Sequence, residues 1–318
     1  MSLSGRRIGR SDLRVNPIGF GCWPIAGVSS LNVTEESSLE TLNAALDSGI
    51  NFFDTAFGYG FNGEADHLLA KLIQNRRQEM ILASKVGIGF DSEKQRFVDG
   101  RPATLLKQAE QVLDRLKVSE VEIMYLHAVD PETPIEESAG AIAEIVTRGW
   151  ARYAGVSNVT ASELERFHQE CPVVAVQPPF NMLQQEQVSE LRSICEREQI
   201  AIVSYWALMK GLLTGKFARD HEFDPRDKRL TYEIYQGQAW QQSQDFLDQL
   251  RTLANEVGCS VSQLVMAWTI RQPGITVALC GAKRPSQIRE TSQAASLALP
   301  PETLGIIDSW ILKTDIGV

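Results

Sequence analysis

Residues 51–60 read Asn-Phe-Phe-Asp-Thr-Ala-Phe-Gly-Tyr-Gly, which begins with a short apolar run that ends on the carboxylate of Asp54. The same pattern recurs at residues 80–85, Met-Ile-Leu-Ala-Ser-Lys, and at residues 123–127, Ile-Met-Tyr-Leu-His. Runs without strict polar alternation are typical of strands that are buried on both faces of a parallel sheet. These stretches therefore predict buried parallel strands, each of which ends on an ionisable side chain.

Eight such runs are spread along the chain, and amphipathic segments with helical spacing lie between them. Strands that alternate with helices predict a parallel sheet, and a count of eight favours a closed (β/α)8 barrel of the TIM class. An open doubly wound sheet is the alternative, but residues 19–23 read Gly-Phe-Gly-Cys-Trp instead of its Gly-x-Gly-x-x-Gly turn. The predicted strands are 17–20, 51–53, 80–83, 121–126, 151–156, 173–176, 200–204 and 276–279.

The rest of the chain is predicted to complete a single barrel domain over residues 1–318. Residues 1–14 are expected to form a hairpin that covers the floor of the barrel. Residues 206–240 predict a long irregular connection, a kind of segment that is usually functional, and a helix is expected at about 239–256. Capping boxes predict helix starts at Thr133–Glu136, Thr160–Glu163 and Ser260–Gln263.

The composition excludes several classes of protein. The chain has 31 Lys and Arg against 40 Asp and Glu, a net charge of −9, and such an acidic protein repels nucleic acid and anionic lipid. No apolar run reaches the roughly 20 residues of a membrane-spanning helix, and no secretory signal is seen. The 5 cysteines are scattered without a CxxC pair, so no structural zinc site is indicated. We expect a cytoplasmic monomer or small homo-oligomer with no metal, nucleic-acid or membrane partner.

Residues at the strand ends predict an active site. In a barrel of parallel strands the C-terminal ends meet at one rim, where enzymes of this fold carry their active sites. Asp54, Lys85 and His127 would meet there, and Tyr59 follows in a loop flanked by glycines. A phenol has an ordinary pKa of about 10. The ammonium of Lys85, fixed by Asp54, is expected to lower the pKa of Tyr59 and make it a general acid, while a neutral His127 binds a substrate carbonyl.

No side chain at this rim supplies an attacking group, so hydride from a nicotinamide cofactor is the reagent that fits a carbonyl acceptor. Ser157, Asn158 and Gln177 follow other predicted strands and offer a hydroxyl and amides to a carboxamide. Tyr205 offers a flat ring on which a nicotinamide could stack. Residues 281–284, Gly-Ala-Lys-Arg, stand at a predicted helix start and offer cations and backbone N–H groups to a phosphate.

The chain resembles the aldo-keto reductases from the N-terminal hairpin to about Ala295. The resemblance rests on six motifs that occur in order at the spacing of this family. They are residues 51–60 as quoted above, Ser84-Lys-Val-Gly87, Tyr125-Leu-His-Ala-Val-Asp130, Gly155-Val-Ser-Asn158, Gln177-Pro-Pro-Phe-Asn181 and Gly211-Leu-Leu-Thr-Gly-Lys216.

This resemblance implies an eight-stranded α/β barrel that binds NAD(P)(H) and acts on carbonyls, with Tyr59 as the acid–base residue. The implied catalytic tetrad is Asp54, Tyr59, Lys85 and His127. The residues implied to bind the nicotinamide end are Ser157, Asn158, Gln177 and Tyr205. Those implied to bind the adenosine phosphate are Gly281, Lys283, Arg284 and Gln287. The lysine and arginine of the last group favour NADP(H), with NAD(H) as the second choice.

The chain departs from the family pattern at two places. Trp206-Ala207-Leu208 stands where the family usually has Ser-Pro-Leu, and Glu290-Thr291 stands where Glu-Asn is common. Trp23 and Phe57, together with the 206–240 segment, are expected to line the substrate pocket. Their apolar side chains favour aromatic or aliphatic carbonyls.

Three functions are considered for this sequence. The first is an NADP(H)-dependent reductase of aldehydes or ketones, and the alternative is an NADPH-binding, redox-sensing regulatory subunit with weak turnover, similar to potassium-channel β-subunits. We expect the reductase because the chain shows no N-terminal extension for a channel partner. A metal-dependent hydrolase would need His-x-His after the first strand, where residues 19–21 read Gly-Phe-Gly.

Overall fold

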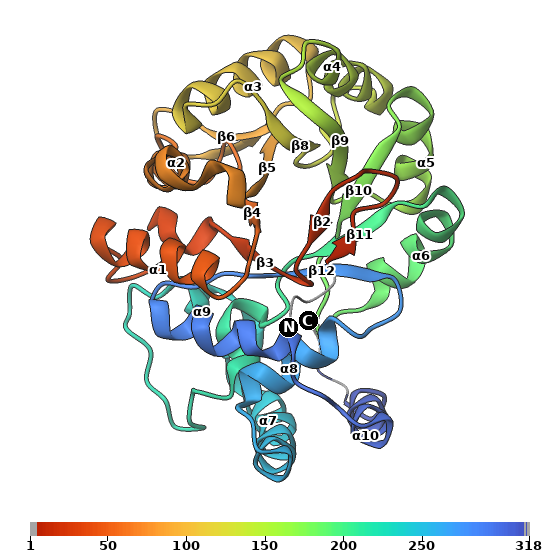
Figure 1. Ribbon diagram of the computed structural model, residues 1–318. Helices are drawn as coiled ribbons and strands as arrows, with labels where there is room; N and C mark the ends of the chain where they lie inside the picture. The colour runs from red at the N-terminus through yellow and green to blue at the C-terminus, as the bar shows by residue number, and fades with distance from the viewer. Residues whose placement is uncertain (1–4, 315, 317–318) are drawn as a thin grey trace.

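Eight strands form a closed, all-parallel barrel in the computed structural model, which describes residues 5–314 and 316 (Figure 1). The last strand pairs with the first, and each predicted run overlaps one barrel strand, so the predicted TIM barrel is confirmed. In order around the barrel the strands are β3 (Ile18–Gly21), β4 (Phe52–Asp54), β5 (Ile81–Val86), β8 (Val121–Leu126), β9 (Ala151–Ser157), β10 (Val173–Gln177), β11 (Ala201–Ser204) and β12 (Ile275–Cys280).

Helices between the strands form the outer layer of the barrel, as the coloured ribbon in Figure 1 shows. The helix expected at about 239–256 is confirmed as α7, and α10 follows the last barrel helix. The helices are α1 (Glu35–Asp47), α2 (Glu64–Arg76), α3 (Pro102–Leu116), α4 (Ile135–Thr147), α5 (Ala161–Glu170), α6 (Glu186–Glu198), α7 (Gly237–Val257), α8 (Val261–Thr269), α9 (Pro285–Ser292) and α10 (Pro301–Ile311).

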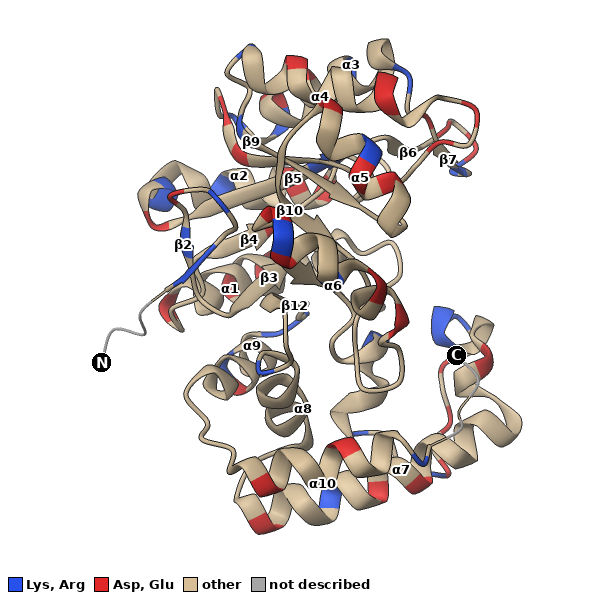
Figure 2. Ribbon diagram, turned by 90° about the vertical axis from the view of Figure 1, so that its right-hand side faces the viewer, with Lys and Arg blue, Asp and Glu red and all other residues tan. Residues whose placement is uncertain are grey.

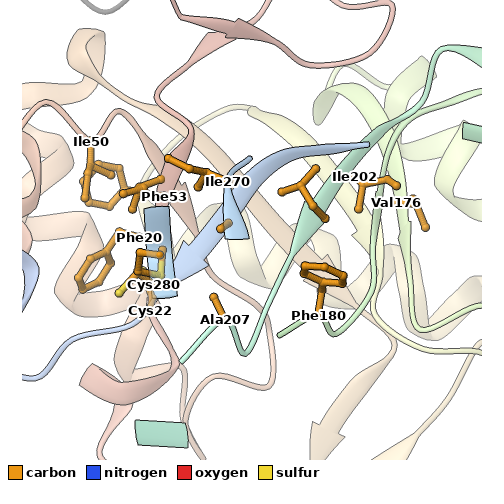
Figure 3. Close-up of a cluster of buried hydrophobic side chains, with 14 of the residues drawn as sticks. Phe20, Cys22, Ile50, Phe53, Val176, Phe180, Ile202, Ala207, Ile270 and Cys280 are labelled. Atoms are coloured by element: carbon orange, nitrogen blue, oxygen red, sulfur yellow. The ribbon is translucent and has the colours of Figure 1, made fainter. Parts of the chain in front are cut away.

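The barrel strands separate two apolar cores. Since successive strand residues point to opposite faces, Phe52 packs in the small core inside the barrel and Phe53 in the large core under the helices. Figure 3 shows part of the large core, where Phe20 and Phe53 lie near each other with their ring centroids 5.8 Å apart. Full burial of one such side chain contributes about 1.5–3 kcal/mol. This two-sided burial explains why the strands lack polar alternation.

The N-terminal hairpin closes one end of the barrel, as predicted. Its strands β1 (Arg6–Arg7) and β2 (Arg14–Val15) pair in antiparallel fashion, and the buried side chain of Ile8 belongs to the core inside the barrel. Gly9 has a φ of +48°, and a Cβ atom there would lie only 2.3 Å from the carbonyl oxygen of Val174. Only glycine allows this close approach of the hairpin to the barrel. Residues 1–4 of the predicted hairpin lie outside the described residues.

Two of the three predicted capping boxes are confirmed. The hydroxyls of Thr160 and Ser260 each accept a hydrogen bond from the backbone N–H of the third helix residue, and the side chain of that residue accepts one from the backbone N–H of the cap. The prediction for Thr133 is wrong, because α4 begins after Pro134 and the hydroxyl of Thr133 donates to Asp130 at 2.8 Å. The helix therefore starts one residue later than predicted, with Pro134 at its N-cap, and Thr133 lies outside the capping position.

The 206–240 segment is more regular than predicted. It contains three short 3-10 turns, η3 (Met209–Thr214), η4 (Lys228–Thr231) and η5 (Glu233–Tyr235). Its rings pack on one another, with Phe223 centred 5.5 Å from Tyr235 and 5.8 Å from Trp240. A second hairpin after β5, which the sequence analysis did not predict, pairs β6 (Ile88–Phe90) with β7 (Arg96–Val98).

Charged residues of both signs are interspersed over the helices (Figure 2). The chain's excess of acidic residues is therefore spread along many elements. Within residues 5–314 and 316, no helix is both long enough and apolar enough to span a membrane.

Candidate active site

Alternate residues of each strand point into the barrel, and this places the predicted ionisable side chains at its C-terminal mouth. Each of three residues stands two positions after a side chain of the core inside the barrel, so it points to the same interior face. The pairs are Phe52 and Asp54, Ala83 and Lys85, and Tyr125 and His127. Alignment of the parallel strands then brings the three polar groups together.

Lys85 lies at the centre of this group and is fully buried. Its Nζ donates to Asp54 Oδ1 at 2.5 Å, to the carbonyl oxygen of Thr55 at 2.9 Å and to Tyr59 Oη at 3.0 Å. An ammonium carries three hydrogens, so all of its donor capacity is used. The predicted pairing of Asp54 with Lys85 is a completely desolvated ion pair, and such a pair persists only with good geometry and full hydrogen bonding.

Tyr59 is held beside Lys85 by the loop after β4. Gly60 has a φ of +121°, where a side chain would be strained, and a Cβ atom at Gly58 would lie 2.9 Å from the carbonyl oxygen of Ile88. The two glycines thus permit the turn that the sequence predicted. The Tyr59 ring meets His127 edge to face, with centroids 5.9 Å apart.

The protonation states differ in part from the prediction. Burial, reinforced by the carboxylate of Asp54, raises the pKa of Tyr59 well above its ordinary value, so Lys85 does not produce the predicted lowering. Burial, and secondarily the ammonium of Lys85, lowers the pKa of His127 well below its ordinary value. The phenol therefore holds its proton firmly and the imidazole is neutral at pH 7. Among the described residues, His127 Nδ1 is buried and has no hydrogen-bond partner.

The residues expected to hold a carboxamide form a hydrogen-bonded chain next to the tetrad. Ser157 Oγ donates to the carbonyl oxygen of Gln177 at 2.7 Å, and Gln177 Nε2 donates to Asp54 Oδ2 at 2.8 Å. Asn158 Nδ2 donates to the carbonyl oxygen of His127 at 2.8 Å, and Tyr205 Oη donates to Asn158 Oδ1 at 2.7 Å. All four therefore lie at one rim, and Gln177 links them directly to the tetrad.

The predicted phosphate-binding stretch stands at the start of α9. Gln287 Oε1 accepts from the backbone N–H groups of Lys283 and Arg284 at 2.9 and 3.2 Å, so these N–H groups already have an acceptor. Burial, and secondarily the nearby guanidinium of Arg229, lowers the pKa of Lys283. A Cβ atom at Gly281 would lie 2.5 Å from Pro24 Cγ, which explains the glycine there. The side-chain cations remain the groups suited to an anion.

The two predicted pocket residues have different surroundings. Trp23 is half-buried and meets the Tyr59 ring edge to face with centroids 5.4 Å apart, so it flanks the tetrad. Phe57 is also half-buried, but its ring lies under the guanidinium of Arg115, whose Cζ is 4.4 Å from the ring centroid. Trp206, the departure from the family pattern, is 42% exposed and packs edge to face on Tyr205.

A second carboxylate lies near the tetrad and was not predicted from the sequence. Asp66, in the first turn of α2, is fully buried and accepts a hydrogen bond from Thr55 Oγ1 at 2.6 Å. Burial raises its pKa to about 7. Its sequence context of Glu64-Ala65-Asp66-His67 resembles an ordinary solvated helix start, so no local signal distinguishes it. Over the part of the chain that the structure describes, no group of three or more potential metal ligands occurs.

Comparisons with known proteins agree with this geometry. The profile described as "Aldo/keto reductase family" matches residues 17–311. The chain is 32% identical to "Aldo-keto reductase YhdN" of Bacillus subtilis (strain 168) over 96% of this chain and 93% of that protein. It is 29% identical to "Probable voltage-gated potassium channel subunit beta" of Arabidopsis thaliana over 96% of both. The structure of the glycerol dehydrogenase AKR11B4 from Gluconobacter oxydans is similar with a TM-score of 0.91 and 28% identity, over 100% of this chain and 98% of that chain.

Proposed function

The chain belongs to the aldo/keto reductase family, and we propose that it is an NADP(H)-dependent reductase that converts aldehydes or ketones to alcohols. One observation carries the proposal: a buried ammonium bridges a carboxylate and a phenol, with a neutral imidazole at the edge of the phenol ring. This arrangement suits proton donation to a carbonyl oxygen while hydride reaches the carbon.

Each member of the tetrad has one task in this proposal. Tyr59 donates its proton to the substrate oxygen, and the Lys85 ammonium at 3.0 Å stabilises the phenolate that remains. Asp54 holds the ammonium in place. His127, which is neutral because its pKa is lowered by burial, donates a hydrogen bond that orients the substrate carbonyl. Solvent then returns a proton to Tyr59.

The residues at the rim fit a nicotinamide dinucleotide. Ser157, Asn158 and Gln177 supply hydroxyl and amide groups at one place, and Tyr205 supplies an adjoining ring. When bound, the cofactor supplies the hydride to the carbonyl carbon. These side chains would orient the carboxamide so that the hydride faces the carbon of the carbonyl whose oxygen Tyr59 protonates.

The cations near α9 support a preference for NADP(H) over NAD(H). Among the ion pairs of residues 5–314 and 316, none involves Lys283 or Arg284, and the neighbouring carboxylate of Asp227 is paired with Arg229. The pKa of Lys283 is lowered by burial and then by the nearby cations. A bound phosphate would offset the repulsion between these cations and stabilise the charged lysine. We infer that Lys283 and Arg284 receive the 2′-phosphate and that Gln287 and Gly281 shape the surrounding backbone.

We infer a small carbonyl compound as the substrate, since Trp23 forms an apolar wall beside Tyr59. The protein would act in the cytoplasm as a monomer or small homo-oligomer. The test is a spectrophotometric screen of NADPH oxidation with aromatic, aliphatic and polyol-derived aldehydes, repeated with NADH. Glyceraldehyde belongs in the panel because a similar structure is that of a glycerol dehydrogenase. Faster oxidation of NADPH with aromatic or aliphatic aldehydes is expected, and no oxidation with any carbonyl would refute the proposal.

A regulatory subunit is the second candidate, because relatives of similar length are named as probable potassium-channel β-subunits. In that case the protein would bind NADPH, turn over slowly and assemble with a membrane protein. Single-turnover kinetics separate the two functions. Rapid hydride transfer and rapid product release are expected of the reductase, and negligible turnover with stable NADPH binding would favour the regulatory subunit.

A further inference from the structure

The ammonium of Lys85 has one acceptor outside the tetrad. Besides Asp54 and Tyr59, its Nζ bonds the carbonyl oxygen of Thr55 at 2.9 Å. Because an ammonium has three hydrogens in fixed tetrahedral directions, this third acceptor sets its rotation. A shift of the Thr55 carbonyl would therefore move the hydrogen that points at the phenol.

Thr55 is itself held from two sides. Its backbone N–H donates to the carbonyl oxygen of Ala83 at 2.8 Å, and its Oγ1 donates to Asp66 Oδ1 at 2.6 Å. Both Thr55 and Asp66 are fully buried, so water does not compete for this bond. A hydrogen bond to a carboxylate is about twice as strong as one between neutral groups. Asp66 is thus the side-chain anchor of the carbonyl that Lys85 uses.

The other oxygen of Asp66 is not satisfied. Within residues 5–314 and 316, Asp66 Oδ2 is buried without a hydrogen-bond partner. The nearest cation is the guanidinium of Arg115, 3.7 Å away, and the same Arg115 nitrogen donates to the carbonyl oxygen of Phe57 at 3.0 Å. A direct charge-assisted bond would be about 2.7–2.9 Å long.

Glu122 shows how this chain pairs a carboxylate that only supports the fold. Its Oε1 accepts from Arg77 at 2.8 Å and its Oε2 accepts from the backbone N–H of Leu82 at 2.7 Å. Both oxygens are satisfied, although Glu122 is 8% exposed and Asp66 is completely buried. Asp66 is buried more deeply than Glu122 but is paired less completely, since its Oδ2 has only the ion pair with Arg115 at 3.7 Å, and stability alone therefore does not explain its position.

We propose that Asp66 is a positioning residue of the catalytic site, which anchors Thr55 for Lys85 and, through its charge, controls how readily Tyr59 releases its proton. The inference rests on the proposed reductase function. Asp66 does not touch substrate or cofactor in this proposal, and it acts only through Thr55 and Lys85.

The charge of Asp66 changes near neutral pH. Burial raises its pKa to about 7, and the opposing influences are Thr55, Arg115 of α3 and Lys85 of β5. The other ionisable groups at this place are Asp54, Tyr59 and the buried thiol of Cys22, whose pKa Asp66 helps to raise. Above pH 7 a second carboxylate near Lys85 opposes formation of the phenolate. Carbonyl reduction should therefore slow as pH rises through about 7.

The anchoring role is tested by comparing Asp66→Ala with Asp66→Asn. The alanine variant removes the acceptor of Thr55, so kcat should fall roughly tenfold to a hundredfold with little change in KM. The asparagine variant keeps an oxygen acceptor and should restore kcat. Thr55→Val removes the same bond from the other side, and it replaces Asp66→Ala if that variant does not fold. Wild-type kcat in both Asp66→Ala and Thr55→Val would overturn the anchoring role.

The charge role is tested by the pH profile of kcat and by infrared difference spectra of the protein without cofactor. The kcat of the wild type should fall on the order of tenfold as pH rises through about 7. This corresponds to a change of about one unit in the pKa of Tyr59 when Asp66 becomes charged. Asp66→Asn should remove this inflection, and the matched control Glu122→Gln should retain it. A protonated-carboxyl band that disappears near pH 7 should be present in the wild type and absent from Asp66→Asn.

The two proposals fail in different ways. A wild type that reduces no carbonyl refutes the reductase function, yet the infrared band and its loss in Asp66→Asn do not depend on turnover. An active wild type whose inflection persists in Asp66→Asn overturns the charge role. The absence of a titrating carboxyl band overturns it as well.

Discussion

The two ends of the barrel are built from the same strands but have opposite character. At the N-terminal end the hairpin side chains of Ile8, Leu13 and Val15 join the apolar core inside the barrel. At the C-terminal end the same interior face carries Asp54 and Lys85, both fully buried. The side chains change from hydrocarbon to charged groups within two residues along a strand.

The residues that stabilise the fold and the residues of the candidate active site therefore lie at opposite ends of the barrel. The closed end gains free energy from apolar burial, and the hydroxyl of its buried Ser11 is satisfied within the hairpin, where it donates to the carbonyl oxygen of Ile8 at 2.6 Å. The open end buries charged groups, and the chain of bonds from Tyr59 through Lys85 and Asp54 to Gln177 satisfies them. Substitutions at the closed end should therefore change stability, and those at the open end should change turnover.

The largest expected effect is the loss of turnover in Tyr59→Phe. If Tyr59 is the proton donor, as proposed, its removal should lower kcat by about 10²–10⁴-fold, the usual contribution of a general acid. The free energy of unfolding should change by only about 1 kcal/mol, because one hydrogen bond to Lys85 is lost. Steady-state NADPH oxidation and urea unfolding measure the two quantities. Equal kcat in wild type and variant would remove the acid role from Tyr59.

Lys85→Met should damage both turnover and stability. It leaves the carboxylate of Asp54 buried and unpaired, which should cost about 3–5 kcal/mol of unfolding free energy. The double variant Lys85→Met with Asp54→Asn removes that charge and should recover part of the stability without recovering turnover. Urea unfolding of both variants checks this, and equal stabilities of the single and double variants would contradict it.

Ile8→Ala tests the closed end. Loss of this fully buried side chain should lower the unfolding free energy by about 2–5 kcal/mol while kcat stays within twofold of the wild type. Urea unfolding and NADPH oxidation on the same preparation provide the measurement. A large fall in kcat at a temperature where the variant is fully folded would show that the two ends are coupled.

The smallest expected effect concerns His127 and pH. Its pKa is lowered in the folded protein, so the unfolded chain binds more protons below pH 6.5, and the stability contributed above that pH is lost as pH falls. His127→Gln should therefore flatten the decline of unfolding free energy between pH 6.5 and 5. Urea unfolding across this range measures the slope, and parallel curves for both proteins would contradict the buried neutral imidazole.

The sequence predicted the barrel and the meeting of the tetrad because both follow from strand periodicity. An apolar run that ends on Asp54, Lys85 or His127 predicts both a buried strand and an ionisable side chain at its C-terminal end. Once the parallel strands close into a barrel, their C-terminal ends meet at one rim. The contact residues of the tetrad could therefore be named before their distances were known.

Features that depend on depth of burial were not predictable in this way. The pKa of Tyr59 rises because the folded loop removes water from the phenol and places it near Asp54. Glu64 and Asp66 stand two residues apart at one helix start, yet packing buries only Asp66 completely. Thr133 failed as a helix cap because loop geometry brings its hydroxyl to Asp130. For Tyr59 and Asp66 the depth of burial in the folded protein decides, and for Thr133 the path of the loop decides, and neither property follows from the residue types alone.

The rings of the 206–240 segment join this segment to the large core under the barrel helices. Phe223, Tyr235 and Trp240 pack on each other, and Arg229 lies over the Phe217 and Phe223 rings. Because the same rings belong to the large core, replacement of this segment by one of different sequence would also disturb the packing of the barrel itself. Changes tolerated in this segment are therefore expected to preserve the positions of these rings.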